Sequence, residues 1–210
     1  MDIQDPHRGQ AVLRQGPDPS AARLSVILVH GRGGAAADML TLAQELDGSD
    51  VAYLAPQAAG ATWYPYSFLA PLADNEPGLS SGLRLLDGLV RDLEARQVPP
   101  DRIALLGFSQ GACLALECAA RHPRPYAAII GLSGGLIGPP GTLRRYAGSF
   151  EGAAAFLGCS DVDPHIPVER VHESSRVFRD LQAVVDERIY PRMGHTINAD
   201  ELDAVAALLK

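Results

Sequence analysis

Ser109 stands at the centre of the pentapeptide Gly107-Phe108-Ser109-Gln110-Gly111, between an apolar run and an alanine- and leucine-rich segment. With 21 glycines in 210 residues, a Gly-x-Ser-x-Gly motif can arise by chance, so the motif alone is weak evidence for a catalytic serine. The context is stronger evidence, because a serine in a Gly-x-Ser-x-Gly turn from strand to helix is exposed on a sharp, strained bend. The flanking glycines let strand and helix approach closely. The pattern predicts a nucleophilic hydroxyl, with the N–H of Gln110 directed at the developing oxyanion.

A serine hydroxyl is a poor nucleophile at neutral pH and needs a base to accept its proton. Of the six histidines, His165 and His195 are placed in loops that follow predicted strands, as is His30, which is expected to be structural. His165 is too near the candidate acids in sequence to be the third vertex, so His195 is the predicted base. The others fall in the amino-terminal segment, a glycine-rich loop, a helix end and a helix: His7, His30, His122 and His172.

A carboxylate must hold the imidazole in the correct tautomer and stabilise its cation. Asp161 and Asp163 both lie in the loop after a predicted strand, in the segment Ser160-Asp161-Val162-Asp163-Pro164. The residues alone therefore place an acid in this loop and leave open which of the two aspartates it is.

A second oxyanion donor is expected from His30-Gly31-Arg32-Gly33-Gly34, which directly follows a predicted central strand. A histidine-glycine pair with further glycines at this place supplies the backbone N–H in serine hydrolases with parallel sheets, here the N–H of Arg32. The alternative is a plain glycine turn into the next helix. The His30 side chain is expected to be structural and hydrogen-bonded rather than catalytic.

Strands and helices alternate along the whole chain. The predicted strands are Gly9–Arg14, Arg23–Val29, Val51–Ala55, Arg102–Phe108, Ala127–Leu132, Ala153–Gly158 and Val184–Tyr190. The predicted helices are Ala36–Leu46, Ser80 or Ser81 to Gln97, the elbow to His122-Pro123, Val168–Leu181, and Asn198 or Asp200 to Lys210. This alternation predicts an α/β fold, a mostly parallel, doubly wound sheet flanked by helices. Its strands deliver serine, acid and histidine, in that order, to one edge, as in α/β-hydrolases.

The loop 61–69 holds four large aromatic side chains, Trp63, Tyr64, Tyr66 and Phe68. One interpretation is the wall of a substrate pocket, since open α/β sheets bind ligands at the carboxyl edge. The other is a loop packed down by its own aromatics. The segment Gly138–Ser149 is too short for a lid domain, which predicts an open, shallow site.

Residues 1–210 are expected to form a single domain, because 210 residues supply one well-filled core and not two. The amino-terminal residues have no basic start and no apolar block, and no apolar run could cross a bilayer, so a cytoplasmic protein without membrane insertion is expected. The net charge of −7 without a basic cluster argues against nucleic acid as a partner. The three cysteines lack metal-type spacing and are expected to be buried free thiols.

Four segments together resemble the phospholipase/carboxylesterase family of α/β-hydrolases: His30-Gly31-Arg32-Gly33, Gly107-Phe108-Ser109-Gln110-Gly111, Asp163-Pro164-His165-Ile166-Pro167 and Met193-Gly194-His195. The family's Asp-Pro-x-x-Pro segment implies Asp163 as the acid, whereas the usual spacing after Gly158 would favour Asp161. Gly31 and His165 are assigned to substrate binding with the four aromatics. Arg32 departs from the family, which often carries an apolar residue there. The resemblance also allows a homodimer.

The resulting hypothesis is a serine hydrolase, without metal or cofactor, that cleaves small to medium carboxylic esters or thioesters through an acyl-enzyme. Ser109 attacks, His195 relays protons, Asp163 orients the imidazole, and the N–H groups of Arg32 and Gln110 hold the oxyanion. The alternatives are a lysophospholipase, peptidase or acyltransferase on the same residues, or a non-catalytic binding protein that keeps the fold.

Overall fold

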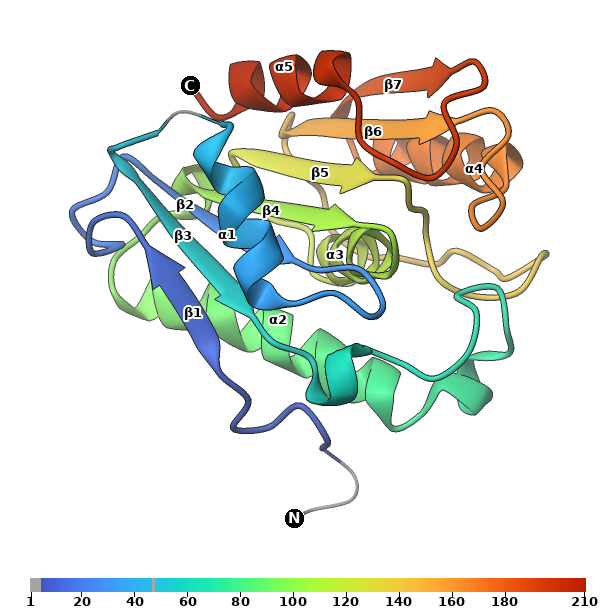
Figure 1. The fold of residues 1–210 in the computed structure, drawn as a ribbon, viewed down its shortest axis with the longest axis horizontal. Helices are drawn as coiled ribbons and strands as arrows, with labels where there is room; N and C mark the ends of the chain where they lie inside the picture. Colours follow the sequence, from blue (N-terminus) through green and yellow to red (C-terminus); the bar gives the residue numbers. More distant parts are fainter. Residues whose placement is uncertain (1–4, 47) are drawn as a thin grey trace.

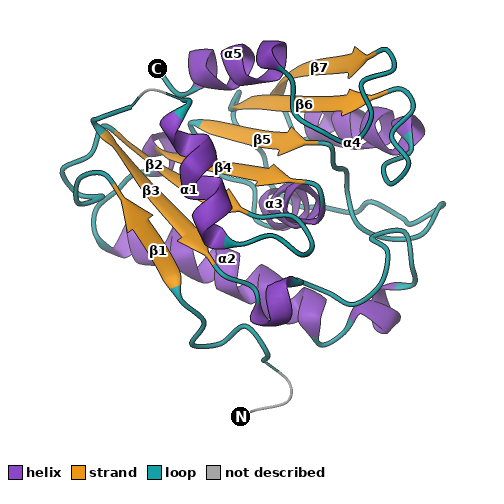
Figure 2. Cartoon of the chain, in the orientation of Figure 1, coloured by secondary structure: helices purple, strands orange, loops and turns teal. Residues whose placement is uncertain are grey.

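The computed structural model describes residues 5–46 and 48–210. Residues 1–4 lie outside the described residues. They belong to the amino-terminal segment in which no secretory signal is expected. The chain forms a seven-stranded sheet in the order β1-β3-β2-β4-β5-β6-β7 (Figures 1 and 2). The strands are β1 (Val12–Gln15), β2 (Leu24–Val29), β3 (Val51–Pro56), β4 (Ile103–Phe108), β5 (Ala128–Leu132), β6 (Ala154–Ser160) and β7 (Val184–Tyr190). Only β1 is antiparallel to its neighbour, so the predicted mostly parallel sheet is confirmed.

Helices cover both faces of this sheet (Figure 2). They are α1 (Ala36–Gln44), α2 (Gly78–Ala95), α3 (Gln110–Arg121), α4 (Val168–Asp180) and α5 (Ala199–Leu208). Side chains of α1 and α5 pack on one face, and those of α2, α3 and α4 pack on the other. Strands β2, β4 and β5 are buried from end to end, apart from the half-buried Phe108 at the end of β4, because helices cover them on both sides. Among the described residues, no helix combines the length and apolar character needed to cross a membrane.

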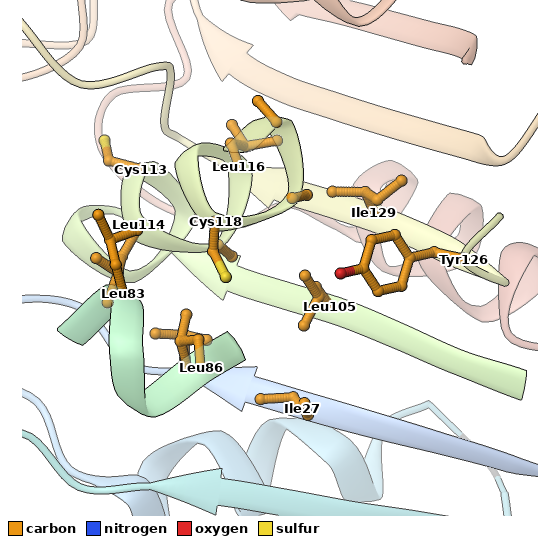
Figure 3. Close-up of a cluster of buried hydrophobic side chains, with 14 of the residues drawn as sticks. Ile27, Leu83, Leu86, Leu105, Cys113, Leu114, Leu116, Cys118, Tyr126 and Ile129 are labelled. Carbon is orange, nitrogen blue, oxygen red and sulfur yellow. The ribbon is translucent and has the colours of Figure 1, made fainter. Parts of the chain in front are cut away.

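The helix α3 lies at the centre of the larger core (Figure 3). Leu114 and Leu116 from α3 meet Leu86 from α2 and Leu105 from β4, all of them fully buried. Each such leucine contributes about 1.5–3 kcal/mol relative to an exposed side chain. A Cβ at Gly131 of β5 would lie 2.7 Å from the Leu116 side chain, so any other residue there would displace this leucine. This packing fixes α3, and with it the turn from β4 that carries Ser109.

Several element boundaries differ from the predictions by one to three residues. Strand β1 begins at Val12 rather than Gly9, and α2 begins at Gly78 rather than at Ser80 or Ser81. Ser81 is not a helix cap: it is fully buried, and its hydroxyl accepts a hydrogen bond from the His7 backbone N–H at 2.9 Å. Strand β6 continues two residues beyond Gly158, because pairing with β7 extends through Ser160.

The helix α5 begins with a capping box between Asn198 and Glu201, which confirms Asn198 as its start. The Glu201 carboxyl is fully buried against Gly158, where an added Cβ would lie 2.2 Å from Glu201 Oε1. Burial raises the pKa of the Glu201 carboxyl to about 7, since one N–H donor does not offset the loss of water.

Glu201 is expected to make the protein less stable as the pH rises. Its carboxyl has a pKa near 4.5 when unfolded and about 7 when folded, so the folded state holds the proton more tightly. The free energy of unfolding of the wild type should fall between about pH 4.5 and pH 7, relative to Glu201→Gln, by roughly 3 kcal/mol at most. Denaturant unfolding of both proteins across this range measures the difference. Parallel curves for the two proteins would contradict the raised pKa.

Candidate active site

Ser109 occupies the turn between β4 and α3 with φ 55° and ψ −121°, a strained conformation for a residue other than glycine. The two glycines of the motif make this turn sterically allowed. A Cβ at Gly107 would lie 2.3 Å from the carbonyl oxygen of Gly111, and a Cβ at Gly111 would lie 2.1 Å from that of Val29. The close approach of strand and helix predicted from the sequence is therefore present, and it presents the hydroxyl at the carboxyl edge of the sheet.

The side chains of Ser109, His195 and Asp163 form one hydrogen-bonded chain. The distance from Ser109 Oγ to His195 Nε2 is 2.9 Å, and His195 Nδ1 lies 2.7 Å from Asp163 Oδ2. An ionised carboxylate only accepts hydrogen bonds, so Nδ1 carries the ring proton and Nε2 is free to accept the serine proton. Residues separated by up to 86 positions thus meet within reach of proton transfer.

Asp163 is buried and fully hydrogen-bonded. Its Oδ1 accepts the backbone N–H groups of His165 at 2.8 Å and Ile166 at 3.0 Å, while Oδ2 faces His195. Burial by itself would raise the pKa of this carboxyl. The hydrogen bonds from His195 and from the two backbone donors outweigh burial, so the pKa of Asp163 lies below its ordinary value. The acid therefore stays ionised beside the imidazole at neutral pH.

Asp161, the other candidate acid, holds a neighbouring loop. Its Oδ1 accepts the backbone N–H of Arg192 at 2.6 Å, and the hydroxyl of Ser160 accepts that of Gly194 at 3.1 Å. These two bonds tie the end of β6 to the loop that carries His195. Asp161 directly follows the last paired residue of β6, whereas Asp163 lies farther along the turn, which brings it over the sheet edge to the imidazole.

Arg32 and Gln110 lie beside Ser109 with their backbone N–H groups unused. Among residues 5–46 and 48–210, neither N–H donates to a protein acceptor. Gly31 leaves space next to the Ser109 side chain, because a Cβ at Gly31 would lie only 3.3 Å from Ser109 Cβ. The Gln110 side chain is locked in place, since its amide donates to Tyr64 O at 2.8 Å and accepts from Trp63 N at 2.9 Å.

His30 has the structural role expected for it. Its Nδ1 lies 2.7 Å from the carbonyl oxygen of Gly31, and its Nε2 accepts the backbone N–H of Ala58 at 3.0 Å. Burial lowers the pKa of the His30 imidazole, which keeps it neutral. The ring fixes the loop that presents Arg32, and it does not join the chain of three side chains at Ser109.

A cavity of about 520 Å³ opens next to Ser109 and His195. It is lined by Arg32, Tyr64, Pro65, Tyr66, Ser67, Phe68, Ser109, Gln110, Cys113, His165, Ile166 and His195. Four of the residues assigned to substrate binding, Tyr64, Tyr66, Phe68 and His165, are in this set. As far as the described residues go, the loop Gly138–Ser149 contributes none of the lining. Cys113 forms part of the floor, and burial raises the pKa of its thiol to about 12.

Trp63 and Gly31 depart from the expected substrate-binding set. The Trp63 indole is completely buried and donates its N–H to the His30 carbonyl oxygen at 2.8 Å, so this aromatic packs the loop down. His7 lies against it: the His7 ring accepts the backbone N–H of Ala59 at 3.1 Å and contacts the Trp63 carbonyl oxygen at 2.9 Å. Trp63 thus fits the interpretation of a loop packed down by its own aromatics, whereas Tyr64, Tyr66 and Phe68 line the cavity.

Sequence reasoning missed a largely buried ionic cluster formed by Glu117, Arg144, Arg170 and Glu173. Glu117 is buried in α3, where its carboxylate accepts the N–H of Ile137 at 3.1 Å and the hydroxyl of Tyr146 at 3.0 Å. Arg170 donates to the carbonyl oxygens of Leu136 and Gly138 at 2.6 and 2.7 Å. Charged residues scattered in loops and helices carry no spacing signal that would have predicted this cluster. Among the described residues, no three His, Cys, Asp or Glu side chains are arranged to hold a metal ion.

Comparison with known proteins decides the family. The model of the phospholipase/carboxylesterase family matches residues 15–210. The chain belongs to this family. It is 40% identical to the phospholipase/carboxylesterase from Dyadobacter fermentans DSM 18053. The superposition on the crystal structure of that protein has a TM-score of 0.91 and covers 96% of this chain and 97% of the Dyadobacter chain.

Further family relatives are esterases and thioesterases by name. Esterase PE8 is 29% identical in sequence to this chain. The superposition on its crystal structure has a TM-score of 0.77 and covers 95% of this chain and 97% of the PE8 chain. Acyl-protein thioesterase 1 of Saccharomyces cerevisiae is 26% identical over 94% of this chain and 96% of its own length. Family membership and fold make the protein a carboxylesterase-type hydrolase with the α/β-hydrolase fold.

Proposed function

We propose that the protein hydrolyses small to medium carboxylic esters or thioesters through an acyl-enzyme formed on Ser109. The observation that carries this proposal is the hydrogen-bonded chain Asp163–His195–Ser109, which ends in an open cavity. Acyl transfer needs an ionised acid, an imidazole whose Nε2 can accept a proton, and a hydroxyl within hydrogen-bonding distance of Nε2, and the distances between these three side chains fit that need.

The first half of the reaction acylates Ser109. Its Oγ attacks the ester carbonyl carbon while His195 Nε2 accepts the hydroxyl proton, and the resulting imidazolium is stabilised by the Asp163 carboxylate. The carbonyl oxygen becomes an oxyanion that the N–H groups of Arg32 and Gln110 bind, aided by the amino-terminal end of α3. His195 then gives its proton to the leaving alcohol or thiol as the bond to the carbonyl carbon breaks.

The second half repeats these steps with water. His195 takes a proton from a water molecule that attacks the acyl carbon, and the same N–H groups hold the second oxyanion. Collapse of this intermediate returns the proton to Ser109 Oγ and releases the carboxylic acid. No metal or cofactor takes part in this scheme.

The proposed substrate range follows from the cavity lining. Tyr64, Phe68 and Ile166 supply apolar surface for an acyl or alcohol group of moderate size. The 60% exposed Tyr66 stands at the rim, and the hydrogen bonds that Arg32 and Asn75 donate to Tyr66 O and Ser67 O hold this loop in place, which limits the room for long acyl chains.

A panel of 4-nitrophenyl esters from acetate to palmitate, with matched thioesters, tests this range. The expected kcat/KM is highest for acyl chains of about two to eight carbons and at least about tenfold lower for palmitate. Preference for palmitate or for a lysophospholipid would favour a lysophospholipase instead. Transfer of the acyl group to an added alcohol in preference to water would favour an acyltransferase.

A further inference from the structure

Arg32 places a fixed positive charge on the wall of the cavity. Its Nη1 donates to Thr62 Oγ1 at 3.0 Å and to Pro65 O at 2.8 Å, and its Nη2 donates to Tyr66 O at 2.6 Å. These acceptors are neutral oxygens, so they orient the guanidinium without neutralising it. Within the described part of the chain, the Nε–H and one N–H of Nη2 have no acceptor, and both are donors that a carboxylate can use.

Among residues 5–46 and 48–210, no acidic side chain is paired with the Arg32 guanidinium. The residues that line the cavity include no Asp or Glu, and Arg32 forms no ion pair with any described residue. Asp38, the nearest acid along the chain, instead accepts the backbone N–H of Ala35 at 2.8 Å and caps α1. The arginines of the buried cluster differ, because Arg144 and Arg170 are both paired with Glu173. In a chain of net charge −7, an uncompensated guanidinium in the cavity is a specific attractor for anions.

We propose that Arg32 binds a carboxylate carried by the substrate, so that the preferred esters are anionic. This inference rests on the proposed hydrolysis at Ser109. The backbone N–H of Arg32 faces the reacting carbonyl oxygen, so its side chain holds a second group of the same small molecule. Arginine suits this task because its planar fork matches a carboxylate with two parallel hydrogen bonds. The substrate class is the half-ester of a small dicarboxylic acid, or an ester of a hydroxy or phenolic acid.

Two pairs of esters test whether Arg32 binds a carboxylate on the acyl part or on the alcohol part of the substrate. Monophenyl glutarate is compared with phenyl glutaramate, and 4-carboxyphenyl butyrate is compared with 4-carbamoylphenyl butyrate. Each amide has the shape of its acid without the charge. We expect the acid-to-amide ratio of kcat/KM to be about tenfold in at least one pair, as a charge-assisted hydrogen bond allows. Raising the salt concentration to about 0.5 M should lower this ratio, because ions screen the attraction.

Three variants assign the effect to the guanidinium. Arg32→Gln should bring the ratio to about one, and Arg32→Lys should keep it closer to the wild-type value. A ratio cancels any loss of rate common to both esters, such as a shift of the loop 62–66. Arg176→Gln is the matched control, because it removes one exposed positive charge of α4 outside the cavity lining and should leave the ratio unchanged.

Ratios at or below one in the wild type, or a ratio that Arg32→Gln leaves unchanged, would overturn the inference while the proposed hydrolysis stands. Binding provides the readout if the wild type hydrolyses none of these esters, in which case the proposed function fails. Calorimetric titration of Ser109→Ala with each ester should then show tighter binding of the acid than of its amide. That difference should vanish in Ser109→Ala/Arg32→Gln, and its absence from Ser109→Ala would overturn the inference.

Discussion

Replacing Ser109 with alanine should lower kcat/KM for a short-chain 4-nitrophenyl ester by roughly 10⁵–10⁶-fold. No other hydroxyl is in contact with His195 Nε2 among the described residues, so the variant cannot form the acyl-enzyme. The loss corresponds to about 7–8 kcal/mol of transition-state stabilisation. The free energy of unfolding should change by no more than about 1 kcal/mol, since alanine fits the same backbone and removes one hydrogen bond.

Ser20→Ala is the matched control for this variant. Ser20 is exposed, and among the described residues its hydroxyl donates a hydrogen bond to Asp18 alone, so hydrolysis should stay within about twofold of the wild type. Ester turnover and denaturant unfolding of all three proteins make the comparison. A Ser109→Ala protein that keeps more than about one hundredth of the wild-type rate, after contaminating esterases are excluded, would contradict the role of Ser109.

The second large effect is expected for Asp163→Asn, with a loss of about 10³–10⁴-fold in kcat. The backbone N–H groups of His165 and Ile166 need an acceptor, so the amide oxygen of the asparagine takes the place of Oδ1. The amide nitrogen then takes the place of Oδ2 and faces His195 Nδ1. The amide donates to Nδ1, which moves the ring proton to Nε2. The imidazole then cannot accept the proton of Ser109. Steady-state hydrolysis of the same short-chain ester measures this loss.

Asp161→Asn makes the same chemical change two residues earlier and serves as the control. Its remaining carbonyl oxygen still accepts the Arg192 N–H, so the loop that carries His195 keeps its anchor. The expected loss is less than about tenfold. A collapse of activity in Asp161→Asn with near-normal activity in Asp163→Asn would show that the acid has been assigned to the wrong residue.

The sheet and the edge at which Ser109 and His195 lie could be predicted from local patterns. Apolar strands such as Arg102–Phe108 and helices with a regular apolar face produce signals that do not depend on the rest of the chain. Parallel strands then deliver their carboxyl ends to one edge, so Ser109 and His195 were expected to meet. The choice between Asp161 and Asp163 was beyond local reasoning. It depends on how far β6 remains paired with β7, and that pairing continues to Ser160.

Long-range contacts account for what the sequence did not reveal. His7 lies in an amino-terminal segment without periodicity, yet it is 1% exposed because it packs against Trp63. Trp63 could not be separated by residue type from Tyr64, Tyr66 and Phe68, since all four side chains are aromatic. Its indole turns inward because the buried carbonyl oxygen of His30 needs a donor. The side chain of Arg32 likewise finds its acceptors about 30 residues away.

The central claim is that folding activates one hydroxyl, that of Ser109, by placing it on an imidazole held by a carboxylate. Reaction with a fluorophosphonate, followed by mass spectrometry of the digested protein, tests it most directly because the reagent attaches only to activated serines. The wild type should take up one equivalent on Ser109, Asp163→Asn should react much more slowly, and Ser109→Ala should stay unlabelled. A folded wild-type protein that remains unlabelled, or one labelled on a different residue, would contradict the account.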